Sequence, residues 1–100
     1  MKHLITGLNK IFESRIRLGI MSILMVNEWI DYKALKELLD ATDGNLASHL
    51  SNLEKHEMIE VQKQFIGRKP NTRYTATQKG KELFKEHLDN LNRLIQSQQK

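Results

Sequence analysis

Residues 42–54 read TDGNLASHLSNLE, and this stretch decides the fold that we expect. Its leucines recur at intervals of four and three residues, which is the spacing of one helical face: Leu46, Leu50 and Leu53. Thr42 suits the N-cap position, because its hydroxyl can accept a hydrogen bond from an amide of the first turn. The stretch therefore predicts an amphipathic helix over about residues 43–55, with one polar face left open.

Upstream of this helix, the sequence predicts a second short helix and a tight turn. Asp31 suits the N-cap of the short helix, which ends near Asp40. Its leucines are Leu35, Leu38 and Leu39. Two short helices joined in this way form a helix-turn-helix unit, whose second helix can present its outer face. An opening amphipathic helix is expected over about residues 9–26, and a minimal strand at residues 29–30.

Downstream, the pattern changes from helical to strand-like. Residues 58–65 are rich in Ile, Val and Phe, residues 67–71 have turn chemistry, and residues 72–76 resume a strand. Together they predict a β-hairpin with a basic tip. Thr77 then caps a long final helix with a wide apolar stripe: Leu83, Phe84, Leu88, Leu91, Leu94 and Ile95.

The order of these elements predicts the architecture. Three helices, a two-stranded β-wing and a long C-terminal helix form an α+β, mostly α, winged helix-turn-helix fold. No repeat or linker divides the chain, so we expect a single domain over residues 1–100 with its core at about 10–80. The terminal segments 1–26 and 77–96 are expected to contribute to dimerisation.

The distribution of charge favours a polyanionic partner. The net charge is +4, and residues 61–81 hold six basic residues and no acid. The rest of the chain holds ten basic and twelve acidic residues and is slightly negative. A basic block on an acidic body is typical of a nucleic-acid-binding surface. From charge alone, a solvated face that binds nothing is the alternative.

The open face of the helix at 43–55 carries the candidate residues for reading DNA. They are Thr42, Gly44, Asn45, Ser48, His49 and Asn52. An asparagine side chain can bond adenine through two atoms in the major groove, and Ser or His can reach base edges or phosphates. An ordinary polar solvent face is the alternative, because small polar residues occur on many exposed helices.

The hairpin tip carries the second group of candidates. Arg68, Lys69 and Arg73 converge on one short turn without a nearby acid, and Gly67 and Pro70 shape that turn. Guanidinium groups bind phosphates bidentately or enter a narrow minor groove. A solubilising loop tip is the alternative. The secondary candidates for phosphate contact are Lys33, Lys36 and Lys55.

The stretch at 42–54 resembles the recognition helix of small bacterial and archaeal winged-helix regulators related to the MarR and ArsR groups. The continuation, IEV at 59–61, GRKPNTRY at 67–74 and TQKG at 77–80, resembles their wing and the start of their last helix. The resemblance implies a dimeric, DNA-binding transcriptional regulator, with the polar helix face in the major groove and the basic hairpin as the wing. Glu57 departs from these relatives, which commonly have glycine before the first wing strand. The metal-sensing relatives use cysteines, and this chain has none.

The outer helices are expected to form the dimer. The final helix has a near-heptad seam at Phe84, Leu88, Leu91 and Ile95. Apolar residues near the N-terminus complete this surface: Leu4, Ile5, Leu8 and Ile11. A two-fold dimer would place two recognition helices ~34–36 Å apart on DNA. A monomer that folds the final helix back on itself is the alternative.

The sequence gives little support for disulfides, metal binding or catalysis. With no cysteine, the chain has no disulfides and no thiolate metal sites. The histidines, His3, His49, His56 and His87, lack the usual two-ligand helical spacing, and no nucleophile–base pair is recognisable. We therefore expect no metal, no cofactor and no enzymatic activity. The longest apolar run, residues 18–26, is too short to cross a bilayer and no signal peptide is recognisable, so we expect a cytoplasmic protein.

The combined patterns predict a homodimeric transcriptional regulator that binds double-stranded DNA sequence-specifically. A winged-helix protein-docking module without DNA binding is the alternative. RNA binding is disfavoured because the six aromatic residues form no recognisable stacking platform. The operator sequence, the direction of regulation and a small-molecule effector stay open.

Overall fold

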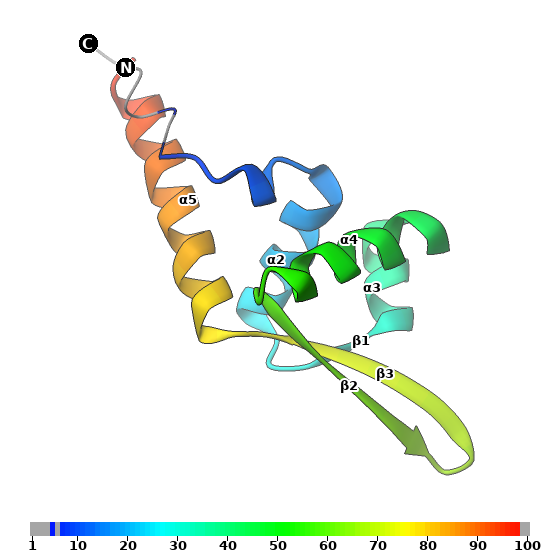
Figure 1. Ribbon diagram of the computed structural model, residues 1–100. Helices are drawn as coiled ribbons and strands as arrows, with labels where there is room; N and C mark the ends of the chain where they lie inside the picture. The colour runs from blue at the N-terminus through cyan, green and yellow to red at the C-terminus, as the bar shows by residue number, and fades with distance from the viewer. Residues whose placement is uncertain (1–4, 6, 99–100) are drawn as a thin grey trace.

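The computed structural model describes residues 5 and 7–98, and it has the predicted order of helices and hairpin (Figure 1). His3 and Leu4 lie outside the described residues. The elements are a 3-10 turn η1 (Lys10–Phe12), α2 (Arg15–Val26), β1 (Ile30–Asp31), α3 (Tyr32–Leu39), α4 (Asp43–Lys55), β2 (Ile59–Ile66), β3 (Lys69–Ala76) and α5 (Gln78–Gln96). The predicted winged helix-turn-helix architecture is confirmed, and α4 has the predicted bounds.

Side-chain caps define where the helices begin. Asp31 Oδ1 accepts a hydrogen bond of 2.8 Å from the Ala34 amide at the start of α3. Thr42 and Thr77 accept in the same way, with their hydroxyls, from amides three residues ahead in α4 and α5. All three predicted caps are confirmed. Each satisfies an amide that has no partner within its helix.

The opening helix is shorter than predicted. Instead of starting near Asn9, α2 starts at Arg15, because the Ser14 hydroxyl accepts a hydrogen bond from the Arg17 amide. The Asn9 side chain caps the separate turn η1 by accepting from the Ile11 amide. Two capping residues close together therefore divide one periodic apolar segment into two pieces, and Phe12 between them still reaches the core.

The wing has its two predicted strands, β2 and β3, and the minimal strand expected at residues 29–30 lies at Ile30–Asp31 and joins them as a third. The order of the sheet is β1-β3-β2, all antiparallel, and β1 pairs Ile30 with Tyr74. The strand β3 also begins earlier than predicted, at Lys69, so the hairpin turn contains only Gly67 and Arg68. Gly67 has φ +65°, a left-handed conformation that glycine adopts without steric cost.

The core lies between the helices and the base of the sheet. Its fully buried side chains include Ile20, Met21, Leu24, Leu35, Leu46, Leu53, Met58 and Ile59. Phe84 of α5 joins them, only 2 % exposed, with its ring edge-on to Phe12 at a centroid distance of 5.1 Å. The structure therefore places Phe84 inside the chain's own core and not on the predicted dimer seam.

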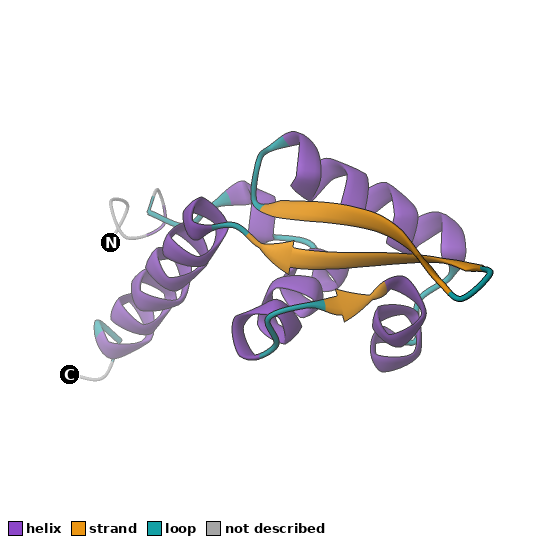
Figure 2. Ribbon diagram, turned by 90° about the horizontal axis from the view of Figure 1, so that it is seen from below, coloured by secondary structure: helices purple, strands orange, loops and turns teal. Residues whose placement is uncertain are grey.

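The molecule is elongated because two elements project from this core. Its principal extents are 59 × 25 × 21 Å, and its radius of gyration of 15.2 Å exceeds the ~13 Å typical of a compact chain of this length. The hairpin of β2 and β3 projects at one end and α5 at the other (Figure 2). Among the described residues, no helix combines the length and the apolar character that a membrane crossing requires.

Candidate nucleic-acid interface

The outer face of α4 is polar and open to solvent. Gly44, Ser48, Ser51 and Lys55 follow one another at intervals of four and three residues and are all exposed. Asn45 is exposed beside them. The opposite face is buried in the core. The helix therefore presents a strip of glycine and serine that ends at Lys55, and its small residues allow close approach of another surface.

His49 and Asn52 flank this strip and are half-buried. Burial lowers the pKa of His49 below its ordinary value of 6.5, and the positive charge of Arg17 lowers that pKa further. At neutral pH, His49 thus carries an uncharged imidazole, which offers one donor and one acceptor. Such a ring suits a hydrogen bond to a base edge better than charge pairing with phosphate.

Contacts from α3 hold the start of α4. The Tyr32 hydroxyl donates to Asp43 Oδ1 at 2.9 Å, and Lys36 Nζ lies 3.0 Å from Asp43 Oδ2. The hydrogen bond from Lys36, followed by that from Tyr32, lowers the pKa of Asp43. Lys36 was expected to contact phosphate. The structure instead pairs its charge with Asp43, so it positions α4 within the helix-turn-helix unit.

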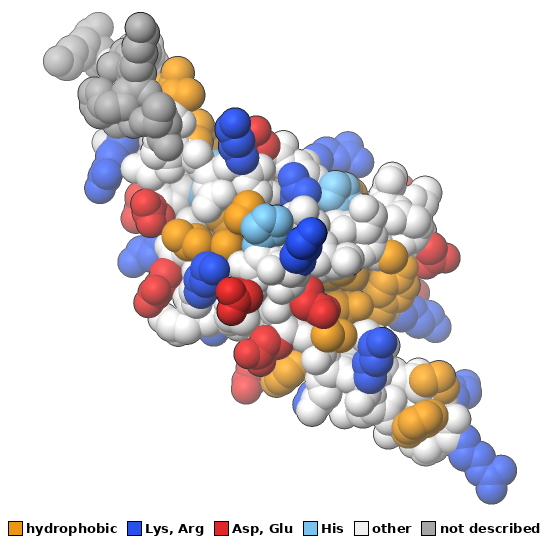
Figure 3. Space-filling view, in the orientation of Figure 1, with side chains coloured by type: hydrophobic (Ala, Val, Ile, Leu, Met, Phe, Trp, Pro, Cys, Tyr) orange, Lys and Arg blue, Asp and Glu red, His pale blue; other side chains and the backbone are white. Residues whose placement is uncertain are grey.

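The distal half of the wing is basic. Lys63, Arg68 and Lys69 are exposed, and within the described part of the chain no carboxylate lies within ion-pair distance of them. The space-filling view shows Lys and Arg side chains around this end of the hairpin (Figure 3). Two of the three predicted tip residues, Arg68 and Lys69, are therefore at the tip.

Arg73 does not converge with them. It lies four residues along β3 from Lys69, which corresponds to roughly 13 Å in an extended strand. Its guanidinium lies over the Trp29 ring, 4.3 Å from the centroid, and its Nε donates to the Gln62 side chain. The expected convergence of all three cations is wrong, because the strand begins before Pro70 and separates Arg73 from the turn. Arg73 thus links β3 to β2 and to Trp29, which precedes β1.

An open cleft of about 540 Å³ separates the helix-turn-helix unit from the wing. Lys33 of α3 and Lys63 of β2 line it, together with Tyr32, Ala47 and Thr72. It brings two cations, the hydroxyls of two tyrosines and a threonine, and the carboxylate of Asp31 to one concave surface. Lys33 was a candidate for phosphate contact, and its place beside this cleft supports that role.

Two residues of this surface were missed by the sequence analysis. Ser51 follows Ser48 by three residues, so helical spacing already placed it on the open face of α4. Lys63 was counted only as part of the basic segment. Its position beside the cleft depends on how the hairpin folds back along α4, and no local signal in the sequence predicts that.

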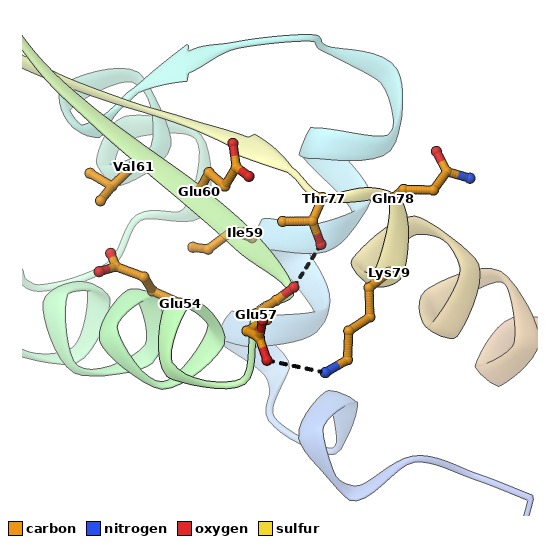
Figure 4. A pocket seen from close by; sticks show the side chains of 8 residues that line it. All are labelled: Glu54, Glu57, Ile59, Glu60, Val61, Thr77, Gln78 and Lys79. Atoms are coloured by element: carbon orange, nitrogen blue, oxygen red, sulfur yellow. Dashed lines mark hydrogen bonds and ion pairs between the residues drawn. The ribbon is translucent and has the colours of Figure 1, made fainter.

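The base of the wing carries the opposite charge. A groove at this point is lined by Glu54, Glu57 and Glu60, with Lys79 at its edge (Figure 4). Lys79 Nζ lies 3.8 Å from Glu57 Oε1, and the Thr77 hydroxyl donates to the Glu57 carbonyl at 2.7 Å. No group of three or more potential ligands in the described residues is arranged to hold a metal ion. The carboxylates instead restrict the anion-attracting part of the wing to its distal half.

The C-terminal part of α5 presents two different faces. Its inner face is polar: the buried Asn90 donates to the Gly7 carbonyl at 2.7 Å, and the buried His87 accepts from the Asn9 amide. Its apolar side chains are exposed instead: Leu88, Leu91 and Ile95. Leu8, the other predicted dimer residue, is half-buried. Beyond Phe84, α5 thus turns two polar side chains toward the N-terminal segment and exposes three apolar ones.

The fold and the polar face of α4 beside a basic hairpin define a winged-helix domain, and comparisons with known proteins agree. Residues 16–95 match the family model described as "Winged helix DNA-binding domain". The chain belongs to this family, so the predicted resemblance to winged-helix regulators is confirmed. A DNA-binding regulator is the class of protein that these findings support.

Particular relatives extend over most of the chain. An uncharacterised protein of Methanocaldococcus jannaschii is 38% identical over 79 residues, 79% of this chain and 86% of that protein. The solved structure of a transcriptional regulator homologue from Pyrococcus horikoshii OT3 is 31% identical, with a TM-score of 0.87 over 97% of each chain. The structure of NadR in complex with 4-hydroxyphenylacetate shares the fold at 18% identity, with a TM-score of 0.72 over 97% of this chain and 68% of that one.

Proposed function

We propose that this protein is a homodimeric transcriptional regulator that recognises a sequence in double-stranded DNA. The observation that carries the proposal is the open polar strip of α4 beside a wing whose distal cations have no acidic partner among the residues that the structure describes. A major groove about 12 Å wide accepts one α-helix, and phosphates on either side of it attract cations. We propose that α4 enters the major groove while the wing contacts the backbone and the adjacent minor groove.

The two parts of this surface have different tasks in the proposal. Asn45, Ser48 and Asn52 read base edges, because amides and hydroxyls distinguish donors from acceptors. Arg68 and Lys69 on the wing, with Lys33 at the cleft and Lys55 at the end of α4, bind phosphates, which carry no sequence information. Thr42 and Gly44 allow the start of α4 to approach the DNA closely. Arg73 contributes by linking β3 to β2 and to Trp29.

We further propose that the exposed apolar face of α5 forms the dimer. Leu88, Leu91 and Ile95 recur at intervals of three and four residues, and the exposed Ile5 lies near the N-terminus. A monomer would leave this face in water. A two-fold dimer would cover it and set two copies of α4 about one DNA turn apart, ~34–36 Å, for a pseudo-palindromic site.

The test of DNA binding is a titration of a fluorescent mixed-sequence duplex, followed by anisotropy at several salt concentrations. We expect salt-dependent binding by the wild-type protein. The double variant Arg68→Ala/Lys69→Ala should weaken binding to every duplex and lower the salt slope by about 0.9 for each lost phosphate contact. The double variant Lys81→Ala/Lys85→Ala, which removes the same charge from exposed sites on α5, is the control and should keep the slope.

The second measurement separates base reading from phosphate binding. After a preferred site has been selected from a random library, Asn45→Ala and Asn52→Ala should each cost about 1–3 kcal/mol of discrimination against other sequences. Equal losses on all sequences from both groups of variants would contradict the division between helix and wing. If the wild-type protein binds no duplex at low salt, the regulator proposal is wrong, and a protein-docking function replaces it.

A further inference from the structure

The tip of the wing exposes two large apolar side chains that the fold does not use. Phe65 is 74 % exposed and Ile66 is 62 % exposed, at the end of β2. Earlier in the same strand, Ile59 is buried and Val61 is half-buried against the core. The strand therefore continues past the point where it contributes to the core, and its last residues place hydrocarbon in water, which is unfavourable.

Cations surround these apolar side chains. Ile66 is paired across the hairpin with Lys69, and Arg68 follows in the turn. Lys63 lies two residues before Phe65 and so shares its face of the strand. Figure 3 shows hydrophobic side chains at this end of the molecule with Lys and Arg side chains beside them. Phe65 and Ile66 follow one another along β2 and so lie on opposite faces of the hairpin, and the tip therefore carries one apolar side chain on each face with cations nearby.

This combination fits one partner of stated chemistry, duplex DNA approached through its minor groove. The phosphates at the rims of that groove complement the cations, and the stacked bases at its floor complement the apolar side chains. A purely phosphate-binding loop would need only the cations.

We propose that Phe65 and Ile66 form a wedge that enters the minor groove, partly separates two stacked base pairs and bends the duplex, while Arg68 and Lys69 hold the flanking phosphates. The inference rests on the proposed DNA binding and adds DNA bending to it. Apolar wedges of this kind kink DNA by about 20–90°. Behind the tip, Arg73 joins the middle of the hairpin to Gln62 of the neighbouring strand and to Trp29, which precedes β1.

Bending is measured by ligase-catalysed cyclisation of a mixed-sequence DNA fragment of about 120 base pairs, shorter than the persistence length of DNA. The protein variants are the wild type, the double variant Phe65→Ser/Ile66→Ser, and Val26→Ser as the control. Val26 is 81 % exposed at the end of α2, so its variant removes an equally exposed apolar side chain away from the wing. Thermal unfolding confirms that each variant is folded.

At saturating protein, we expect the wild type and Val26→Ser to raise the cyclisation rate at least about tenfold, because a kink brings the ends of a stiff fragment together. The wedge variant should stay within about twofold of free DNA while it keeps the wild-type salt slope, since its phosphate contacts remain. Wild-type binding without faster cyclisation would overturn the wedge and leave DNA binding intact. Equal cyclisation by the wedge variant would also overturn it. An absence of duplex binding by the wild type would overturn both proposals.

Discussion

At the scale of single residues, Glu57 stands where the resemblance to winged-helix regulators led us to expect glycine. Its φ is +61°, in the left-handed region between α4 and β2, so the turn keeps the conformation that glycine would adopt. For a residue with a Cβ this conformation costs about 1–2 kcal/mol. The ion pair of 3.8 Å with Lys79 is exposed and offsets little of that cost. Glutamate instead of glycine at this position therefore strains the backbone.

We predict that Glu57→Gly raises the free energy of unfolding by about 1 kcal/mol, because it removes the strain. Urea unfolding measures the change. Glu57→Ala is the control, since it removes the carboxylate and keeps the Cβ, and it should give no gain. An equal gain from both variants would instead point to repulsion among Glu54, Glu57 and Glu60 in the groove at the base of the wing.

His87 couples the N-terminal segment to α5 and makes stability depend on pH. It is buried, its Nδ1 accepts from the Asn9 amide at 3.0 Å, and its ring lies 5.4 Å from that of Phe12. Burial lowers the pKa of His87 below 6.5, although the negative charge of Glu13 opposes the shift. The folded state therefore favours the neutral ring, which alone can accept this hydrogen bond.

Because the pKa is lower in the folded state, the unfolded state takes up a proton first as pH falls. The stabilisation from His87 is thus complete above about pH 6.5 and is lost on acidification below that value. We predict that His87→Gln reduces the loss of stability between about pH 6.5 and 5, measured by urea unfolding. Equal slopes for wild type and His87→Gln would contradict this account.

At the scale of elements, the start of α5 is seated directly on the backbone before β2. The Thr77 amide donates to the Met58 carbonyl at 3.0 Å. A Cβ added at Gly80 would lie 2.1 Å from that carbonyl oxygen, and the obstacle is backbone. Because glycine has no Cβ, α5 can pack closely against the backbone at Met58, and any other residue at position 80 would prevent this close packing. The direction in which α5 leaves the core depends on this contact.

We predict that Gly80→Ala lowers the free energy of unfolding by about 2 kcal/mol or more, because α5 must move outward. Gly44→Ala makes the same chemical change in α4, where nothing lies within 4 Å of the added Cβ. It should stabilise the protein by about 0.5–1 kcal/mol through helix propensity. Thermal and urea unfolding report both values. If Gly80→Ala left the free energy of unfolding unchanged, α5 would not pack as closely against Met58 as it does in the structure.

At the scale of the whole molecule, the two surfaces that we assign to partners lie at opposite ends. The wing projects from one end of the core, and α5 with its exposed apolar face projects from the other (Figure 1). Separation along a 59 Å molecule allows a dimer to form without covering the wing. The elongated shape is therefore consistent with simultaneous pairing and DNA contact.

We predict that Leu88→Asp/Leu91→Asp converts a dimer into a folded monomer, as measured by sedimentation. Both side chains are exposed, so the substitutions leave the core intact, while charges in an apolar seam are costly. Leu38→Asp, at another exposed apolar site, should sediment like the wild type. If the double variant also sedimented like the wild type, the seam would have to lie elsewhere.

The sequence by itself determined the last three helices with their caps, the hairpin and the basic segment, whereas the caps Asn9 and Ser14 that divide the opening segment were missed. The predicted features depend on contacts within about four residues or on strict periodicity, so Asp31, Thr42 and Thr77 could be assigned their caps directly. The exposed strip of α4 followed from the same periodicity, and so did the presence of an apolar stripe on α5.

Only the tertiary structure decided which residues of the α5 stripe are buried in the core and which are exposed. It also decided which cations are engaged by other side chains. Phe84 is buried against Phe12, whereas Leu88 stays exposed, because α5 leaves the core partway along its length. Lys36 pairs with Asp43, and Arg73 stacks on Trp29. Each outcome depends on residues brought together by packing, over separations at which local propensity carries no information.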